Sequence, residues 1–60
     1  MELPRVKNVI KDPRRDVTYV VMAYRQLTRQ EIVFGVQCYL SRVKKKPKKG
    51  DTVTIYSVFS

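Results

Sequence analysis

The fold of this chain is decided by one stretch, Val17-Thr18-Tyr19-Val20-Val21-Met22-Ala23-Tyr24-Arg25. β-Branched and aromatic side chains dominate it, and such side chains fit the pleated surface of a sheet. The stretch is apolar on both of the faces that a strand would present, which is typical of a central strand. We therefore predict a strand over residues 17–25.

The same stretch also fits a helix. Its apolar positions at helical intervals are Val17, Val20, Val21, Tyr24 and Leu27, and the residue that could cap them is Asp16. A helix here would make the chain a winged helix-turn-helix, in which the following helix enters the major groove of DNA. The outer face of that helix would offer Gln30, Gln37, Ser41 and Arg42 to base edges. The density of β-branched residues favours the strand, and the winged fold is the alternative.

A helix is predicted immediately after this stretch. Thr28 and Glu31 have the spacing of a capping box, and Leu27 and Ile32 have the spacing of a hydrophobic staple. The apolar face that follows consists of Ile32, Val33, Val36, Tyr39, Leu40 and Val43. We expect the helix to run over 29–44, with the lysines from 44 to 46 at its negative end and Pro47 closing it.

Two further strands complete the prediction. Residues 5–10 read as a short strand, and 11–16 read as a loop because Asp12-Pro13 favours a turn. Residues 51–59 alternate between two faces and read as the last strand. The order β-β-α-β predicts an α+β fold, with a three-stranded sheet and one helix packed on one face. The strand order stays open between 2-1-3, which is antiparallel throughout, and 1-2-3, which is mixed.

The composition points to a class of partner. The chain has 60 residues, 13 Lys and Arg against 5 Asp and Glu, no His, and a net charge of +8. This length predicts a single small basic domain over 1–60, with a basic loop at 44–50 between the helix and the last strand. So much positive charge on a small domain attracts polyanions, so the expected partner is DNA, RNA or another polyanion.

The predicted topology gathers this charge at one end of the domain. If the helix returns antiparallel to the 17–25 strand, its last residues come back beside the 11–16 loop. The predicted phosphate-binding residues are Lys11, Arg14, Arg15, Lys44, Lys45, Lys46, Lys48 and Lys49. Arginine offers phosphate a bidentate fork and lysine a mobile charge. The plainer interpretation is a solvated helix end followed by a flexible lysine loop.

One helix leaves one face of a three-stranded sheet uncovered. Tyr24 and Tyr56 are the tyrosines that could stack on bases there. The alternative function uses the same surface as a protein interface, formed by Val20, Met22 and Val58 together with Phe34 and Cys38 on the helix. Under it the chain would be a homodimer, or a small accessory or regulatory protein, of the kind found in viruses and mobile elements.

Several functions are expected to be absent. Without histidine there is no histidine base or triad, so the chain is predicted not to be an enzyme. Cys38 is the only cysteine, which rules out an internal disulfide and makes a metal site improbable. No cofactor and no small-molecule substrate are expected. The longest apolar stretch, 17–24, is too short to cross a bilayer, and one unpaired cysteine fits a reducing, cytoplasmic location.

Overall fold

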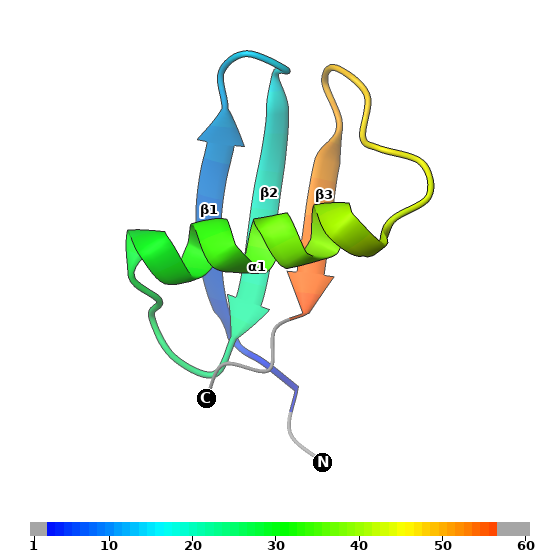
Figure 1. Ribbon diagram of the computed structural model, residues 1–60. Coiled ribbons are helices and arrows are strands. Elements are labelled where there is room, and N and C mark those ends of the chain that lie inside the picture. The colour runs from blue at the N-terminus through cyan, green and yellow to red at the C-terminus, as the bar shows by residue number, and fades with distance from the viewer. Residues whose placement is uncertain (1–2, 57–60) are drawn as a thin grey trace.

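The computed structural model describes residues 3–56 and has the predicted β-β-α-β order. Its elements are β1 (Val6–Asp12), β2 (Val17–Ala23), α1 (Arg29–Arg42) and β3 (Thr52–Tyr56). The three strands form one sheet, and α1 lies across one face of it (Figure 1). The α+β prediction is confirmed, and the winged helix-turn-helix is wrong because residues 17–23 form a strand. The predicted interface residue Val58 lies outside the described residues.

The strand order is β1-β2-β3, the mixed one of the two orders left open. β1 pairs with β2 in antiparallel fashion through a tight turn, with Val9 opposite Val20. β3 pairs with the other edge of β2 in parallel, with Thr54 opposite Val20. A parallel neighbour needs a crossover connection, and α1 provides it. The central position predicted for the 17–25 stretch is therefore correct.

The core lies between the sheet and α1. Side chains alternate along β2, so that Val17, Tyr19, Val21 and Ala23 are buried while the residues between them are half-buried. Leu27, Ile32 and Val36 close the core from the connection and the helix. Val33 was predicted on the buried stripe but is 38% exposed, because it lies at the margin of the helix face that meets β2.

The helix starts as predicted. The Glu31 N–H donates to Thr28 Oγ1 at 3.2 Å, and the Thr28 N–H donates to Glu31 Oε1 at 2.9 Å, which completes the capping box. Arg25, predicted to belong to the strand, instead follows β2. Its guanidinium binds the Glu31 carboxylate with both arms, Nη1 to Oε1 at 3.0 Å and Nη2 to Oε2 at 2.5 Å.

The helix ends earlier than predicted. Its last residue is Arg42, and Val43 is already extended, with its N–H donating to Tyr39 O at 3.1 Å. Lys44, predicted as the last helical residue, lies outside the helix, and Lys45 and Lys46 are correspondingly further from its end. They offer no apolar face to the sheet, and a short helix depends on such packing for its stability.

Asn8 is the only buried polar or charged residue between residues 3 and 56, with 1% of its surface exposed. It belongs to β1, yet its Oδ1 accepts hydrogen bonds from the Leu27 N–H and from Gln26 Nε2, each at 2.8 Å. Its Nδ2 donates to Val21 O at 3.2 Å and to Arg25 O at 3.4 Å. One amide thus ties β1 to β2 and to the connection that leads into α1.

We expect Asn8→Ala to lower the free energy of unfolding by about 2–4 kcal/mol, because it leaves the buried Leu27 N–H without an acceptor. The matched control is Lys7→Ala at the neighbouring exposed position of β1, which should stay within about 0.5 kcal/mol of the parent. Urea unfolding followed by circular dichroism measures both. Equal effects of the two substitutions would show that the Asn8 hydrogen bonds do not hold the connection.

Acid should weaken the start of the helix. The Arg25 guanidinium, and then the Thr28 N–H, lower the pKa of Glu31 from 4.5 to about 2. A depressed folded-state pKa adds stability that is present above the ordinary pKa and is lost as the pH falls from about 4.5 through 2. Glu31→Gln cannot ionise, so its melting temperature should fall less than that of the parent over this range. Asp16→Asn, far from the helix start, serves as the control and should follow the parent's profile.

Candidate nucleic-acid interface

The path of α1 differs from the predicted one. The helix does not run antiparallel to β2 but crosses the strands, from the side of β1 to the side of β3 (Figure 1). Two constraints explain this path. Asn8 of β1 holds residues 25–27, so the helix begins on that side. β3 lies on the other side of β2, so the chain must cross the central strand to reach it.

Part of the predicted basic set still meets, through the far end of the 43–51 loop and not through the helix end. Residues 43–51 lead from the end of α1 to the end of the sheet that carries the β1–β2 turn (Figure 1). There the Gly50 N–H donates to Asp16 O at 2.8 Å, and the Thr18 N–H donates to Asp51 O at 3.0 Å. The first of these hydrogen bonds joins the loop to the turn, and the second joins it to the start of β2.

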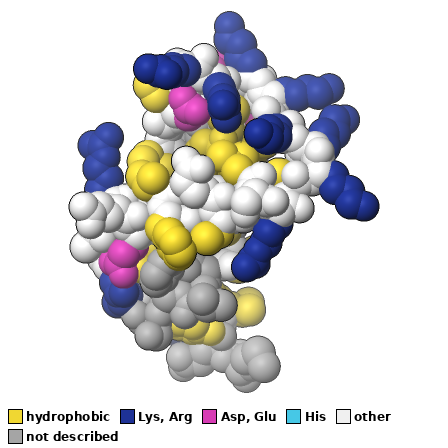
Figure 2. Space-filling model, in the orientation of Figure 1, with side chains coloured by type: hydrophobic (Ala, Val, Ile, Leu, Met, Phe, Trp, Pro, Cys, Tyr) yellow, Lys and Arg dark blue, Asp and Glu magenta, His cyan; other side chains and the backbone are white. Residues whose placement is uncertain are grey.

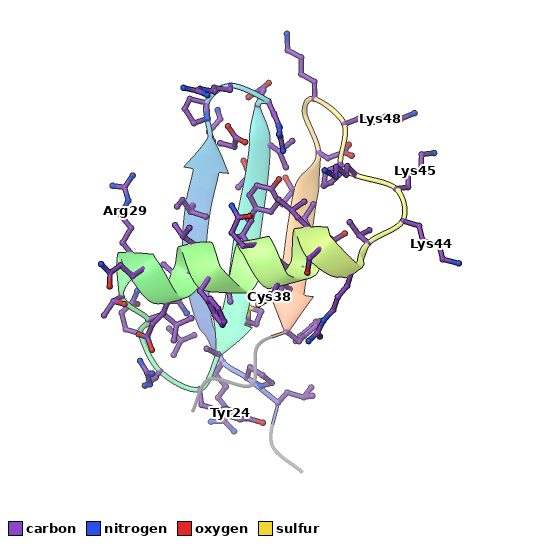
Figure 3. The ribbon with its side chains drawn as sticks, in the orientation of Figure 1. Tyr24, Arg29, Cys38, Lys44, Lys45 and Lys48 are labelled. Carbon is purple, nitrogen blue, oxygen red and sulfur yellow. The ribbon has the colours of Figure 1, made fainter. Side chains whose placement is uncertain are left out.

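We call the eight predicted residues the basic band: Lys11, Arg14, Arg15, Lys44, Lys45, Lys46, Lys48 and Lys49. All eight are exposed. They do not form the compact pole that was predicted, because the lysines at 44 and 45 point away from the domain beyond β3 (Figure 3). On the helix side of the molecule, Lys and Arg side chains line the upper and right margins, with hydrophobic atoms exposed between them (Figure 2).

The aspartates within the band form its turns. Asp12 Oδ1 accepts the N–H groups of Arg14 and Arg15 at 3.0 and 3.4 Å. Asp51 Oδ2 accepts the Lys48 N–H at 2.9 Å, and the Asp51 N–H donates back to Lys48 O at 3.1 Å. The carboxylates therefore shape the loops that present the basic side chains.

Two ion pairs partly neutralise the band. Lys11 Nζ lies 3.3 Å from Asp16 Oδ1, and Arg15 Nε lies 4.0 Å from Asp12 Oδ2. Exposed ion pairs of this kind contribute little to the free energy of unfolding, and their carboxylate is easily replaced by another anion. In the part of the chain that the structure describes, neither Arg14 nor any lysine from 44 to 49 forms an ion pair.

Two hollows open next to the band. The hairpin hollow, of about 320 Å³, lies between the β1–β2 turn and α1. Its apolar lining comes from Ile10, Tyr19, Val33, Val36 and Leu40, with Gln37 from the helix and Lys11, Asp12, Arg14 and Arg15 from the hairpin. The loop hollow, of about 400 Å³, lies under the 45–48 segment beside Tyr39 and the start of β3.

The tyrosines divide between the two sides of the sheet. Tyr19 is buried under α1 and Tyr39 is half-buried. Tyr24 and Tyr56, the predicted stacking residues, are 50% and 70% exposed. Tyr56 pairs with Met22, so it belongs to the face of the sheet turned away from α1, which we call the uncovered face. Tyr24 lies just past the end of β2, far from the basic loop (Figure 3).

The predicted protein-interface residues do not form one surface. Val20 and Met22 are half-buried on the uncovered face, whereas Phe34, which is 61% exposed, and the half-buried Cys38 are on α1. Val9 was missed and is 57% exposed beside Val20 on the uncovered face. The alternation between two strand faces that predicted the last strand also holds over residues 6–12, and it would have placed Val9 on the face away from the helix.

The hairpin hollow was also missed, since it exists only where a helix crosses a sheet. Among residues 3–56, no group of three potential metal ligands is found. In the same part of the chain, no helix is long and apolar enough to span a bilayer. Comparison with protein-family models, with curated proteins and with solved structures finds no match for this chain.

Proposed function

We propose that this chain is a non-enzymatic binding protein that contacts nucleic-acid phosphates through the basic band. The observation that carries the proposal is the hydrogen-bonded junction of the β1–β2 turn with the 48–51 loop. It joins two basic segments that are at least 29 residues apart in sequence, and all eight of their basic side chains are exposed.

The chemistry of the band suits phosphate. Arg14 and Arg15 offer guanidinium groups that match phosphate oxygens, and the lysines add mobile charges around them. The neighbouring carboxylates bind backbone N–H groups of their own turns, so they compete only weakly with a ligand. Such contacts give binding that depends little on sequence and weakens steeply with salt. Neither DNA nor RNA is favoured by the phosphate contacts alone.

The band is tested by charge reversal. Lys45→Glu, Lys46→Glu and Lys48→Glu together should weaken binding to a labelled oligonucleotide at least tenfold, and should lower the slope of log affinity against log salt by roughly 0.9 for each lost phosphate contact. The matched control reverses Arg5, Lys7 and Arg29, which are exposed outside the band and change the net charge equally. Equal losses in both triple variants would show that net charge matters and the band does not.

A second candidate function is protein association through the uncovered face. It is favoured by the exposure there of Val9 and Tyr56, at 57% and 70%, beside the half-buried Val20 and Met22. These side chains give a small domain an apolar surface that a second copy could cover. Under this candidate the chain is a homodimer or a small accessory protein, and the basic band steers an acidic partner.

Light scattering separates the two candidates. If the uncovered face is an interface, the parent has the mass of a dimer or captures its partner, and Val9→Asp returns it to a monomer. Oligonucleotide binding should then be largely retained in Val9→Asp, because Lys11 is the one band residue on β1, two residues from Val9, and the other seven belong to the β1–β2 turn and the 44–49 loop. Gln30→Asp, at an exposed helix position, is the control. A monomeric parent with salt-sensitive oligonucleotide binding would remove this second candidate.

A further inference from the structure

The hairpin hollow differs from the rest of the surface in its chemistry. Apolar side chains of β1, β2 and α1 make up one half of its lining, and Gln37 together with the hairpin residues Lys11, Asp12, Arg14 and Arg15 makes up the other. At about 320 Å³ it lies at the small end of the range of ligand sites in proteins. It opens on the helix side of the molecule, where the basic side chains line the margins of the view (Figure 2).

Tyr19 is the one tyrosine that lines this hollow. Only 3% of the surface of this residue is exposed, and it lines the hollow from β2. Its hydroxyl makes no hydrogen bond among the described residues. No buried side-chain nitrogen or oxygen of that part of the chain lacks a partner, so the Tyr19 hydroxyl must be open to solvent. It is therefore an unused donor and acceptor on a residue that lines the hollow.

We infer that the hairpin hollow receives one unstacked base of a single-stranded nucleic acid whose flanking phosphates lie on the basic band. This inference rests on the proposed function and adds the class of nucleic acid to it. A base has apolar faces and a polar edge, which match the apolar lining and the Tyr19 hydroxyl. Its phosphates carry the negative charge that Arg14 and Arg15 neutralise. In a duplex the base is stacked and paired, so it cannot enter.

The extent of the band favours a nucleic acid over an acidic peptide. The β1–β2 turn that lines the hollow is hydrogen-bonded to the loop that carries the lysines, of which Lys44, Lys45 and Lys48 point outward beyond β3 (Figure 3). Such a row of basic side chains suits a polymer that carries one negative charge on every unit. Only one unit of that polymer needs to insert its planar group into the hollow. Recognition of single strands by a basic groove and by contacts to individual bases is a general mode of binding.

The first experiment compares three labelled oligonucleotides of equal length by fluorescence anisotropy. They are a single strand, the corresponding duplex, and a single strand with abasic sites throughout. We expect the full protein to bind the single strand about tenfold more tightly than the abasic strand, since one base contact accounts for a factor of this size. The affinity for the duplex should fall with salt as phosphate contacts require, but it should lack the tenfold gain that a base in the hollow provides.

Two variants locate the base. Tyr19→Phe keeps the ring and removes the hydroxyl, so it should reduce the preference for the base-bearing strand. Val33→Met with Gln37→Met fills the hollow with flexible, uncharged side chains and should abolish the preference while leaving duplex binding unchanged. Both positions are exposed, so the longer side chains do not displace the core. Val9→Met with Thr54→Met, on the uncovered face, is the matched control, and circular dichroism checks each fold.

The outcomes separate this inference from the proposed function. Equal binding of the base-bearing and abasic strands, or a preference that survives filling of the hollow, would overturn the inference and leave phosphate binding intact. A preference lost in the control pair would move the base to the uncovered face and overturn it as well. No binding of any oligonucleotide at low salt would overturn both proposals. An acidic peptide that binds more tightly than the oligonucleotides, and that no longer binds when the hollow is filled, would overturn the inference and assign the hollow to a protein partner.

Discussion

The buried amide of Asn8 is the interaction on which the rest of the structure depends. A buried polar side chain is tolerated only when its groups are paired, and both ends of this amide are. Because its partners lie on β2 and on the connection that follows, β1, β2 and the start of α1 are held as one unit. The helix then begins beside β1 and must cross β2 before the chain can form β3. The position of the 43–51 loop is a consequence of this crossing.

A three-stranded sheet with one crossing helix has two unlike surfaces. On the helix side, the loop that returns to β3 meets the β1–β2 turn, Lys and Arg side chains line the margins of the view (Figure 2), and the hairpin contributes basic side chains to one wall of the hairpin hollow. On the uncovered face, apolar and threonine side chains are exposed, with Tyr56 at one end of β3. The two proposed functions correspond mainly to these two surfaces, which meet at β1, where Lys11 of the basic band lies two residues from Val9.

The acidic residues explain how so basic a surface folds. Asp12 and Asp51 bind N–H groups of the turns that carry the arginines and lysines, and Glu31 caps the helix while it holds Arg25. Three of the four described carboxylates are thus engaged in local structure, and Asp12 and Asp16 form exposed ion pairs within the band. The excess of positive charge is left on side chains that point into solvent. The proposed phosphate contacts use this excess.

Local patterns in the sequence determined the elements. The β-branched residues of 17–25, the capping box at Thr28 and Glu31, and the alternation after Gly50 predicted β2, the start of α1 and β3, because each pattern acts over a few neighbouring residues. The exposure of all eight basic residues followed from their charge. Tertiary structure alone decided the strand order, the early end of α1, the crossing of the helix and the hollow beneath it. These depend on hydrogen bonds between residues distant in sequence, such as Asn8 with Leu27 and Gly50 with Asp16, and no local pattern specifies which distant groups will meet.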